Sequence, residues 1–102
     1  PDYIKIHIAV FKIKIRLHDS RSLKNKRQFV KSISSIIQKK FNVSISEVKD
    51  QDLWQLATLG ISTVGNSSYH LRSQIFNIIK LIEESKENIS IVDSYQEILT
   101  EF

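Results

Sequence analysis

Cysteine is absent from this sequence, and the chain-breaking residues are scarce, with one proline and two glycines. The absence of cysteine excludes disulfides, thiolate metal sites and thiol nucleophiles. Because few residues interrupt regular structure, most of the chain is expected to form helices and strands. No apolar run approaches the roughly 20 residues that a membrane span needs. The isoleucines near the N-terminus alternate with Lys5 and His7 and do not form the apolar block of a signal peptide. A single cytoplasmic domain over residues 1–102, without membrane association, is therefore expected.

The charges are unevenly distributed along the chain. Hydrophobic residues make up 41% of the sequence, enough for a packed core. Residues 1–50 hold twelve Lys/Arg and four Asp/Glu, a net charge of +8, whereas residues 51–102 have a net charge of −4. This asymmetry fits a basic surface directed at an anionic partner, and it also fits charges that only coat a solvated surface.

Hydrophobic periodicity predicts six segments of regular structure. Strands are expected at 3–17, 43–49, 53–64 and from 89 to 92, and helices at 22–41 and from 66–68 to about 86. Residues 95–102 fit a strand or a helix. In the first strand the apolar residues change parity after Val10, which predicts either a bulge near Val10 or burial of both faces in its first half.

The order of these elements is β-α-β-β-α-β, which predicts an α+β fold of the ferredoxin-like type. In this arrangement two helices cover one face of a four-stranded antiparallel sheet and leave the other face open. The residues expected on the open face come from the first and third strands. They are Lys12, Lys14, Arg16, Thr58, Gly60 and Ser62.

Four cations lie at the predicted start of the first helix, after a candidate N-cap at Ser22. They are Arg21, Lys24, Lys26 and Arg27. The helix dipole is positive at this end, where a cation loses roughly 0.3–1 kcal/mol that an anion would gain. Free backbone N–H groups beside Lys and Arg can form an anion site, with phosphate the obvious candidate, and Lys31 continues the stripe. The alternative is a set of solubilising residues, with Arg21 or Arg27 paired to Asp19.

The other candidates for chemistry give weak signals. Trp54, the single tryptophan, could stack on a base, anchor a protein contact or close one end of the core. Asp50 and Asp52 are typical turn residues. The three histidines lack partners at metal-ligand spacing, and no phosphate-cradling glycine motif occurs. The sequence therefore predicts no enzyme, cofactor, metal site or small-molecule substrate.

The predicted third strand bears on how RNA could be recognised. The RNA-recognition motif places aromatic residues on its central strands. Residues 55–62 contain none. Binding of nucleic acid would therefore depend on phosphate contacts and shape rather than on stacking at the sheet face.

An ordered series of motifs resembles the YlxP-like family of small bacterial proteins, a domain family of unknown function. The motifs are SLKNKR at 22–27, FNVSISEV at 41–48, QDLWQ at 51–55 and LGI at 59–61. The resemblance implies a ferredoxin-like fold and a bacterial cytosolic origin. Genes of this family tend to lie beside genes for translation initiation and ribosome maturation, which implies a link to the ribosome or its RNA. The family supplies no catalytic residues.

The leading hypothesis is an accessory protein that binds RNA through its basic half, with ribosomal RNA as the expected target. Arg21, Lys24, Lys26 and Arg27 would contact phosphates. Four further residues, Lys12, Lys14, Arg16 and Lys31, would extend the surface. The alternative is a protein-interaction module or homodimer that uses the open sheet face, with Trp54 as a partner contact.

Overall fold

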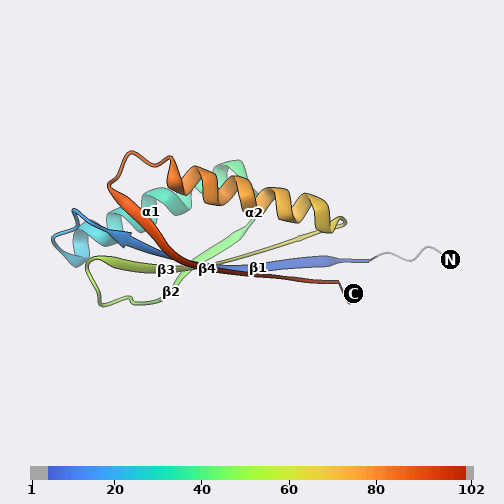
Figure 1. Cartoon of the computed structure of the whole chain (residues 1–102), viewed down its shortest axis with the longest axis horizontal. Coiled ribbons are helices and arrows are strands. Elements are labelled where there is room, and N and C mark those ends of the chain that lie inside the picture. The colour runs from blue at the N-terminus through green and yellow to red at the C-terminus, as the bar shows by residue number, and fades with distance from the viewer. Residues whose placement is uncertain (1–4, 101–102) are drawn as a thin grey trace.

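Two helices lie on one face of a four-stranded antiparallel sheet (Figure 1). The computed structural model describes residues 5–100. The elements are β1 (His7–Leu17), α1 (Leu23–Lys40), β2 (Ser44–Lys49), β3 (Leu56–Gly65), α2 (Ser68–Glu83) and β4 (Ile89–Leu99). The strand order is β2-β3-β1-β4. The predicted ferredoxin-like α+β fold is therefore confirmed.

Strand β1 alternates cleanly between the two faces of the sheet. Its odd-numbered residues are buried under the helices: Ala9, Phe11, Ile13, Ile15 and Leu17. Its even-numbered residues face away from the helices and share that face with the even-numbered residues of β3, because Lys12 pairs with Gly60 and Lys14 with Thr58. The predicted composition of the open face is thus confirmed.

The prediction of a bulge near Val10, or of burial on both faces there, is wrong. Pairing of β1 with β3 runs without a shift from His7 to Arg16. The irregularity lies between Lys14 and Ile15, where Val92 is an extra residue on β4. Val10 is 46% exposed on the open face. The even-numbered apolar residues of β1 therefore form an apolar end of the open face that no helix covers. The change of parity in the sequence could not distinguish this arrangement from a bulge.

Element ends differ modestly from the predictions. Strand β3 begins at Leu56 rather than at residue 53, because residues 50–55 form the loop after β2. Strand β4 continues to Leu99, which settles the ambiguous tail up to that residue. The predicted start of the first strand at residues 3–4 and the last two residues of the tail lie outside the described residues.

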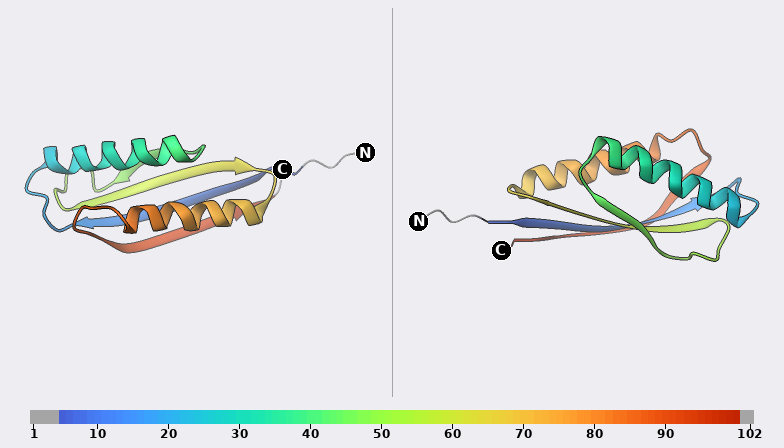
Figure 2. Two further views of the ribbon diagram at one scale, coloured as in Figure 1. Left: turned by 90° about the horizontal axis from the view of Figure 1, so that it is seen from above. Right: turned by 180° about the vertical axis from the view of Figure 1, so that it is seen from behind.

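Three loops meet at one end of the molecule: β1–α1, β2–β3 and α2–β4 (Figure 2). Backbone hydrogen bonds connect them, since Leu17 N donates to Gln55 O and His18 N donates to Asn88 O. The start of α1 lies at this end, and the start of α2 lies at the other. Among residues 5–100, none of the helices has the length and hydropathy to cross a membrane.

Candidate nucleic-acid interface

The start of α1 carries a group of exposed cations. Ser22 caps the helix, as predicted, and its Oγ accepts a hydrogen bond from Asn25 N at 3.0 Å. The first turn contains no acidic residue. Four cations on and just before the helix are exposed: Arg21, Lys24, Arg27 and Lys31. We call these residues the α1 cations.

None of the α1 cations forms an ion pair within the described part of the chain. The proposed pairing of Arg21 or Arg27 with Asp19 does not occur there, and Asp19 instead faces the Asn88 amide at 3.5 Å. Arg21 and Lys24 lie at the positive end of the helix dipole, Arg27 and Lys31 lie further along α1, and the four uncompensated charges repel one another. Their attraction for an anion is correspondingly large.

Lys26 does not belong to this group, which corrects its prediction as a phosphate contact. None of its surface is exposed. Its Nζ donates to the backbone oxygens of Asp50 at 2.6 Å and Gln51 at 3.0 Å. Nζ also lies 2.9 Å from Glu47 Oε2, outside hydrogen-bonding angles, so these two groups attract mainly by charge. Lys26 therefore ties α1 to the β2–β3 loop and is unavailable to a ligand.

Asp50 joins the same loop to the open face of the sheet. Its backbone has φ 65°, in the left-handed region that Asp tolerates better than most residues. Thr58 Oγ1 donates to Asp50 Oδ2 at 2.7 Å, and Lys14 Nζ lies 3.7 Å from the same oxygen. The loop thereby covers Thr58, which is only 2% exposed although it lies on the open face. Asp50 and Asp52 were predicted only as turn residues. The structure shows that Asp50 also connects the helix layer to the open face of the sheet.

The surroundings of Asp50 favour its ionised form. The hydrogen bond from Thr58 lowers the pKa of the Asp50 carboxyl below its ordinary value. Burial acts in the opposite direction, and the charges of Lys14, Lys49 and Lys26 add to the lowering. Asp50 is therefore a carboxylate at neutral pH, and its charge is already engaged inside the protein.

The predicted site residues of β1 lie on a different side of the molecule from the α1 cations. Lys12, Lys14 and Arg16 occupy the open face, whereas α1 lies on the covered face. The eight predicted residues therefore do not form one continuous face. Arg16 is nevertheless at the end of β1 where the β1–α1 loop begins. The two sets of cations approach each other only around this end of the sheet.

Trp54 lies in the β2–β3 loop at that same end and is 55% exposed. Of the three roles considered for Trp54, closure of the core does not hold, because the core is closed by aliphatic residues and by Phe11 and Phe29. Next to it, Leu53 is also exposed. Gln55 follows, and its Nε2 donates to the backbone oxygen of Ser20 at 3.2 Å. Ser20 directly precedes Arg21 in the chain. The exposed indole is thus held close to the β1–α1 loop.

A family model described as "Protein of unknown function (DUF503)" matches residues 8–96. The chain belongs to this family. The match spans every strand and helix from β1 into β4, and with them all the α1 cations and Trp54. The resemblance drawn from the motifs is therefore confirmed, and the family description assigns no activity.

Two known proteins illustrate the likeness of this DUF503 chain. The "Uncharacterized protein YlxP" of Bacillus subtilis (strain 168) is 38% identical over 71 residues, which are 70% of this chain and 77% of that protein. The solved structure of "De novo designed protein Foldit4" matches with a TM-score of 0.53 at 14% identity, covering 93% of this chain and 99% of that one. The second likeness concerns the fold alone.

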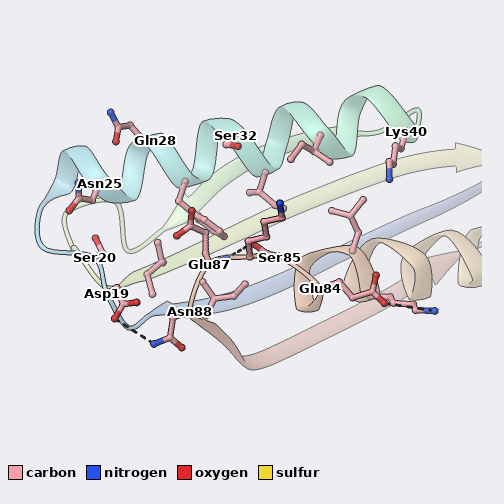
Figure 3. Close-up of a pocket in the computed structure, with 18 of the residues that line it drawn as sticks. Asp19, Ser20, Asn25, Gln28, Ser32, Lys40, Glu84, Ser85, Glu87 and Asn88 are labelled. Atoms are coloured by element: carbon pink, nitrogen blue, oxygen red, sulfur yellow. Dashed lines mark hydrogen bonds and ion pairs between the residues drawn. The ribbon is translucent and has the colours of Figure 1, made fainter.

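The DUF503 chain also has a groove that sequence reasoning missed. A cavity of about 1090 Å³ lies between α1 and α2 and is closed at one end by the α2–β4 loop (Figure 3). Phe29, Ile33 and Leu81 contribute apolar surface to it. Uncharged polar residues line the α1 side at successive turns: Asn25, Gln28 and Ser32. That polar stripe was the available signal. Among residues 5–100, no cluster of acidic or histidine side chains could hold a metal ion.

Proposed function

We propose that this DUF503 protein binds RNA through the start of α1. The observation that carries the proposal is the group of four exposed α1 cations without ion pairs in the described chain. Ribosomal RNA is the target that the gene neighbourhood of the YlxP-like family implies. Such a function requires a cytoplasmic protein, and it involves binding without a catalytic step on the RNA.

Stability alone gives no reason for this arrangement. Asp or Glu in the first turn of α1 would be favoured by roughly 0.3–1 kcal/mol, and cations are disfavoured there. The last turn of the same helix already holds Lys39 and Lys40, where cations are favourable. The sequence thus places cations at both ends, and the unfavourable end is the one that a phosphate would neutralise.

The central strands of the open face support the choice of phosphate contacts over base stacking on those strands. Among the central strands β1 and β3, the open-face residues are aliphatic, small or cationic, with Lys12 opposite Gly60 and Val10 opposite Ser62. The one aromatic residue of these strands, Phe11, is buried beneath the helices. These two central strands therefore present no aromatic platform of the RNA-recognition-motif kind on the open face.

The experiment measures affinity for ribosomal RNA fragments and for heparin at roughly 50 and 200 mM salt. The test variant is Lys24→Ala/Arg27→Ala. The matched control is Lys39→Ala/Lys40→Ala, which removes the same charge from exposed positions of the same helix. Each lost phosphate contact should reduce the slope of log affinity against log salt by about 0.7–0.9.

The proposal predicts tighter binding of RNA than of heparin, a shallower salt slope for the test variant and near-wild-type behaviour for the control. Equal losses in both variants would mean that only net charge matters. No affinity for RNA in the wild type would end the proposal.

The second candidate function is self-association through the open face, without nucleic acid. The specific observation is the exposed apolar end of that face, where Val64 is 64% and Val10 46% exposed. Strand β4 is also an edge strand, unpaired on its outer side. Native mass spectrometry of the wild type and of Val64→Lys tests this function. A dimer that the substitution dissociates supports it, and a monomer at all concentrations excludes it.

A further inference from the structure

We infer that Trp54 stacks on an unpaired base of the bound RNA, so that the partner is a single-stranded or looped segment rather than a continuous duplex. This inference rests on the proposed RNA binding and adds the class of RNA. It is carried by the position of one exposed aromatic residue in a loop that is fastened on both sides.

The exposure of Trp54 needs an explanation. Trp54 is 55% exposed, and exposed Leu53 precedes it. Burying an indole is among the largest apolar gains available to a small domain, and this chain forgoes that gain with its single tryptophan. An aromatic ring of this kind is a platform for a base, since every base has a π-face.

The loop that presents Trp54 is fixed in place rather than loosely attached. On the side of α1, the buried Lys26 donates to the carbonyls of Asp50 and Gln51. On the open face, Thr58 holds the Asp50 carboxylate. After Trp54, Gln55 bonds to Ser20 O through its side chain and to Leu17 N through its carbonyl. A platform held on both sides loses little conformational entropy when a ligand stacks on it.

Charge is arranged so that the loop suits a base and its surroundings suit phosphates. Asp50 is engaged with Thr58 and Lys14, but Asp52 is exposed next to the loop tip. A phosphate placed at the tip would meet that carboxylate, whereas an uncharged base would not. Exposed Arg16 lies on the open face near the end of β1, and exposed Arg21 lies in the β1–α1 loop that follows it. A nucleotide stacked on Trp54 can therefore direct its flanking phosphates to cations at the same end of the molecule.

This arrangement distinguishes between classes of RNA. In a duplex the bases are stacked on one another and present only their edges, so an indole cannot reach a π-face. Unpaired nucleotides in loops, bulges and single strands can splay out onto an aromatic side chain. The α1 cations alone would accept either form, and Trp54 favours the unpaired one.

The test uses the fluorescence of Trp54, which reports on this site alone because the chain has no other tryptophan. The wild-type protein is titrated with oligouridylate, with the duplex of oligouridylate and oligoadenylate, and with an abasic ribose–phosphate oligomer of equal length. Affinities are measured in parallel for Trp54→Ala, for Trp54→Phe and for the control Phe76→Ala, which removes an exposed aromatic residue of α2.

We expect oligouridylate to quench the fluorescence and the other two probes to leave it nearly unchanged. Trp54→Ala should lower the affinity for oligouridylate roughly tenfold without changing the salt slope, and Trp54→Phe should lower it less. Phe76→Ala should bind like the wild type. Since Trp54 is exposed, these variants should unfold at nearly the same temperature as the wild type.

Two failures are distinguishable. RNA binding that depends on Lys24 and Arg27 but is equal for all three probes, without quenching and without an effect of Trp54→Ala, overturns this inference and leaves the proposed function standing. An absence of binding to every probe overturns both.

Discussion

The Lys26 ammonium group lies 2.6 Å from the backbone oxygen of Asp50, although the two residues belong to different layers of the fold. The side chain of Asp50 continues the connection to Thr58 on the far side of the sheet. A single loop residue is thus held from the helix layer through its carbonyl and from the open face through its carboxylate. This junction sets the position of the β2–β3 loop and of Trp54 within it.

Removing the Lys26 side chain should destabilise the protein strongly. Lys26→Ala leaves the largely buried Glu47 carboxylate and two loop carbonyls without their partner. Breaking a buried ion pair from one side costs about 3–5 kcal/mol. Urea unfolding of the variant measures this loss as a lower midpoint.

The matched control for Lys26 is Lys24→Ala, two positions earlier on the same helix and exposed. Its free energy of unfolding should differ from that of the wild type by no more than about 0.5 kcal/mol. Similar losses in the two variants would contradict the role of Lys26 in holding the β2–β3 loop. The double variant Lys26→Met/Glu47→Leu should recover much of the loss, because it leaves no unpaired buried charge.

The Thr58–Asp50 hydrogen bond should make part of the stability depend on pH. The folded-state pKa of Asp50 lies below its ordinary value of 3.8. A depressed carboxyl pKa contributes stability that is present above the unfolded pKa and is lost as the pH falls through the folded one. The destabilisation caused by Thr58→Val should therefore be largest above about pH 4 and shrink below it. Urea midpoints of both proteins between about pH 2.5 and 6 measure the difference.

The chain supplies a matched control for this pH effect. Thr63 is also buried in β3, but its hydroxyl donates to the backbone oxygen of Asn42 at 2.9 Å. A backbone carbonyl does not titrate in this range, so the cost of Thr63→Val should be independent of pH. A Thr58→Val cost that is equally independent of pH would contradict the role assigned to the Asp50 carboxylate.

Gly60 is required by the close approach of Val48 across the open face. A Cβ atom at Gly60 would lie 2.8 Å from Val48 Cγ1, closer than two carbons can approach. Gly60→Ala should therefore cost about 1–3 kcal/mol, as overpacking does. The combination with Val48→Ala should recover most of that cost. A double-mutant cycle by thermal unfolding measures the coupling, and purely additive effects would contradict it.

Regular structure was predictable from this sequence because each element has a strong local signal. Helix α1 begins after the predicted cap at Ser22, and the order of elements follows from the hydrophobic periods. Strand β1 shows the limit of such local signals. Val10 is apolar and therefore resembles a core residue, yet it lies on the open face, where no helix packs. The hydrophobic period of one strand does not reveal whether a helix covers a given face of the sheet.

The candidate site was predictable in part for a similar reason. The dipole argument predicts a site at the start of α1, and three of the four cations predicted there, Arg21, Lys24 and Arg27, are exposed. Lys26 could not be separated from its neighbours, because its burial depends on acceptors in a loop 24 residues away. General preference could not separate a core role for Trp54 from a surface role. Its exposure follows from long-range bonds to Ser20 and Lys26 that hold the loop outward, and those bonds have no local pattern.

Changing the cap of α1 should separate stability from RNA binding. Asp caps a helix about as well as Ser, and its charge interacts favourably with the helix dipole. Ser22→Asp should therefore raise the free energy of unfolding by about 0.3–1 kcal/mol. The same carboxylate lies among the α1 cations, next to Arg21, and neutralises part of the charge that the proposed function uses. RNA affinity should fall severalfold with a shallower salt slope.

Ser67→Asp is the corresponding control at the cap of α2, whose first turn also lacks an acidic residue. It should give a similar gain in stability, but its position at the other end of the molecule should leave RNA binding unchanged. Equal effects of the two substitutions on RNA affinity would contradict a site at the start of α1. If Ser22→Asp alone raises the free energy of unfolding and lowers RNA affinity, the start of α1 is less stable than it could be because its charges serve ligand binding. Such a trade-off between stability and function is common at functional sites.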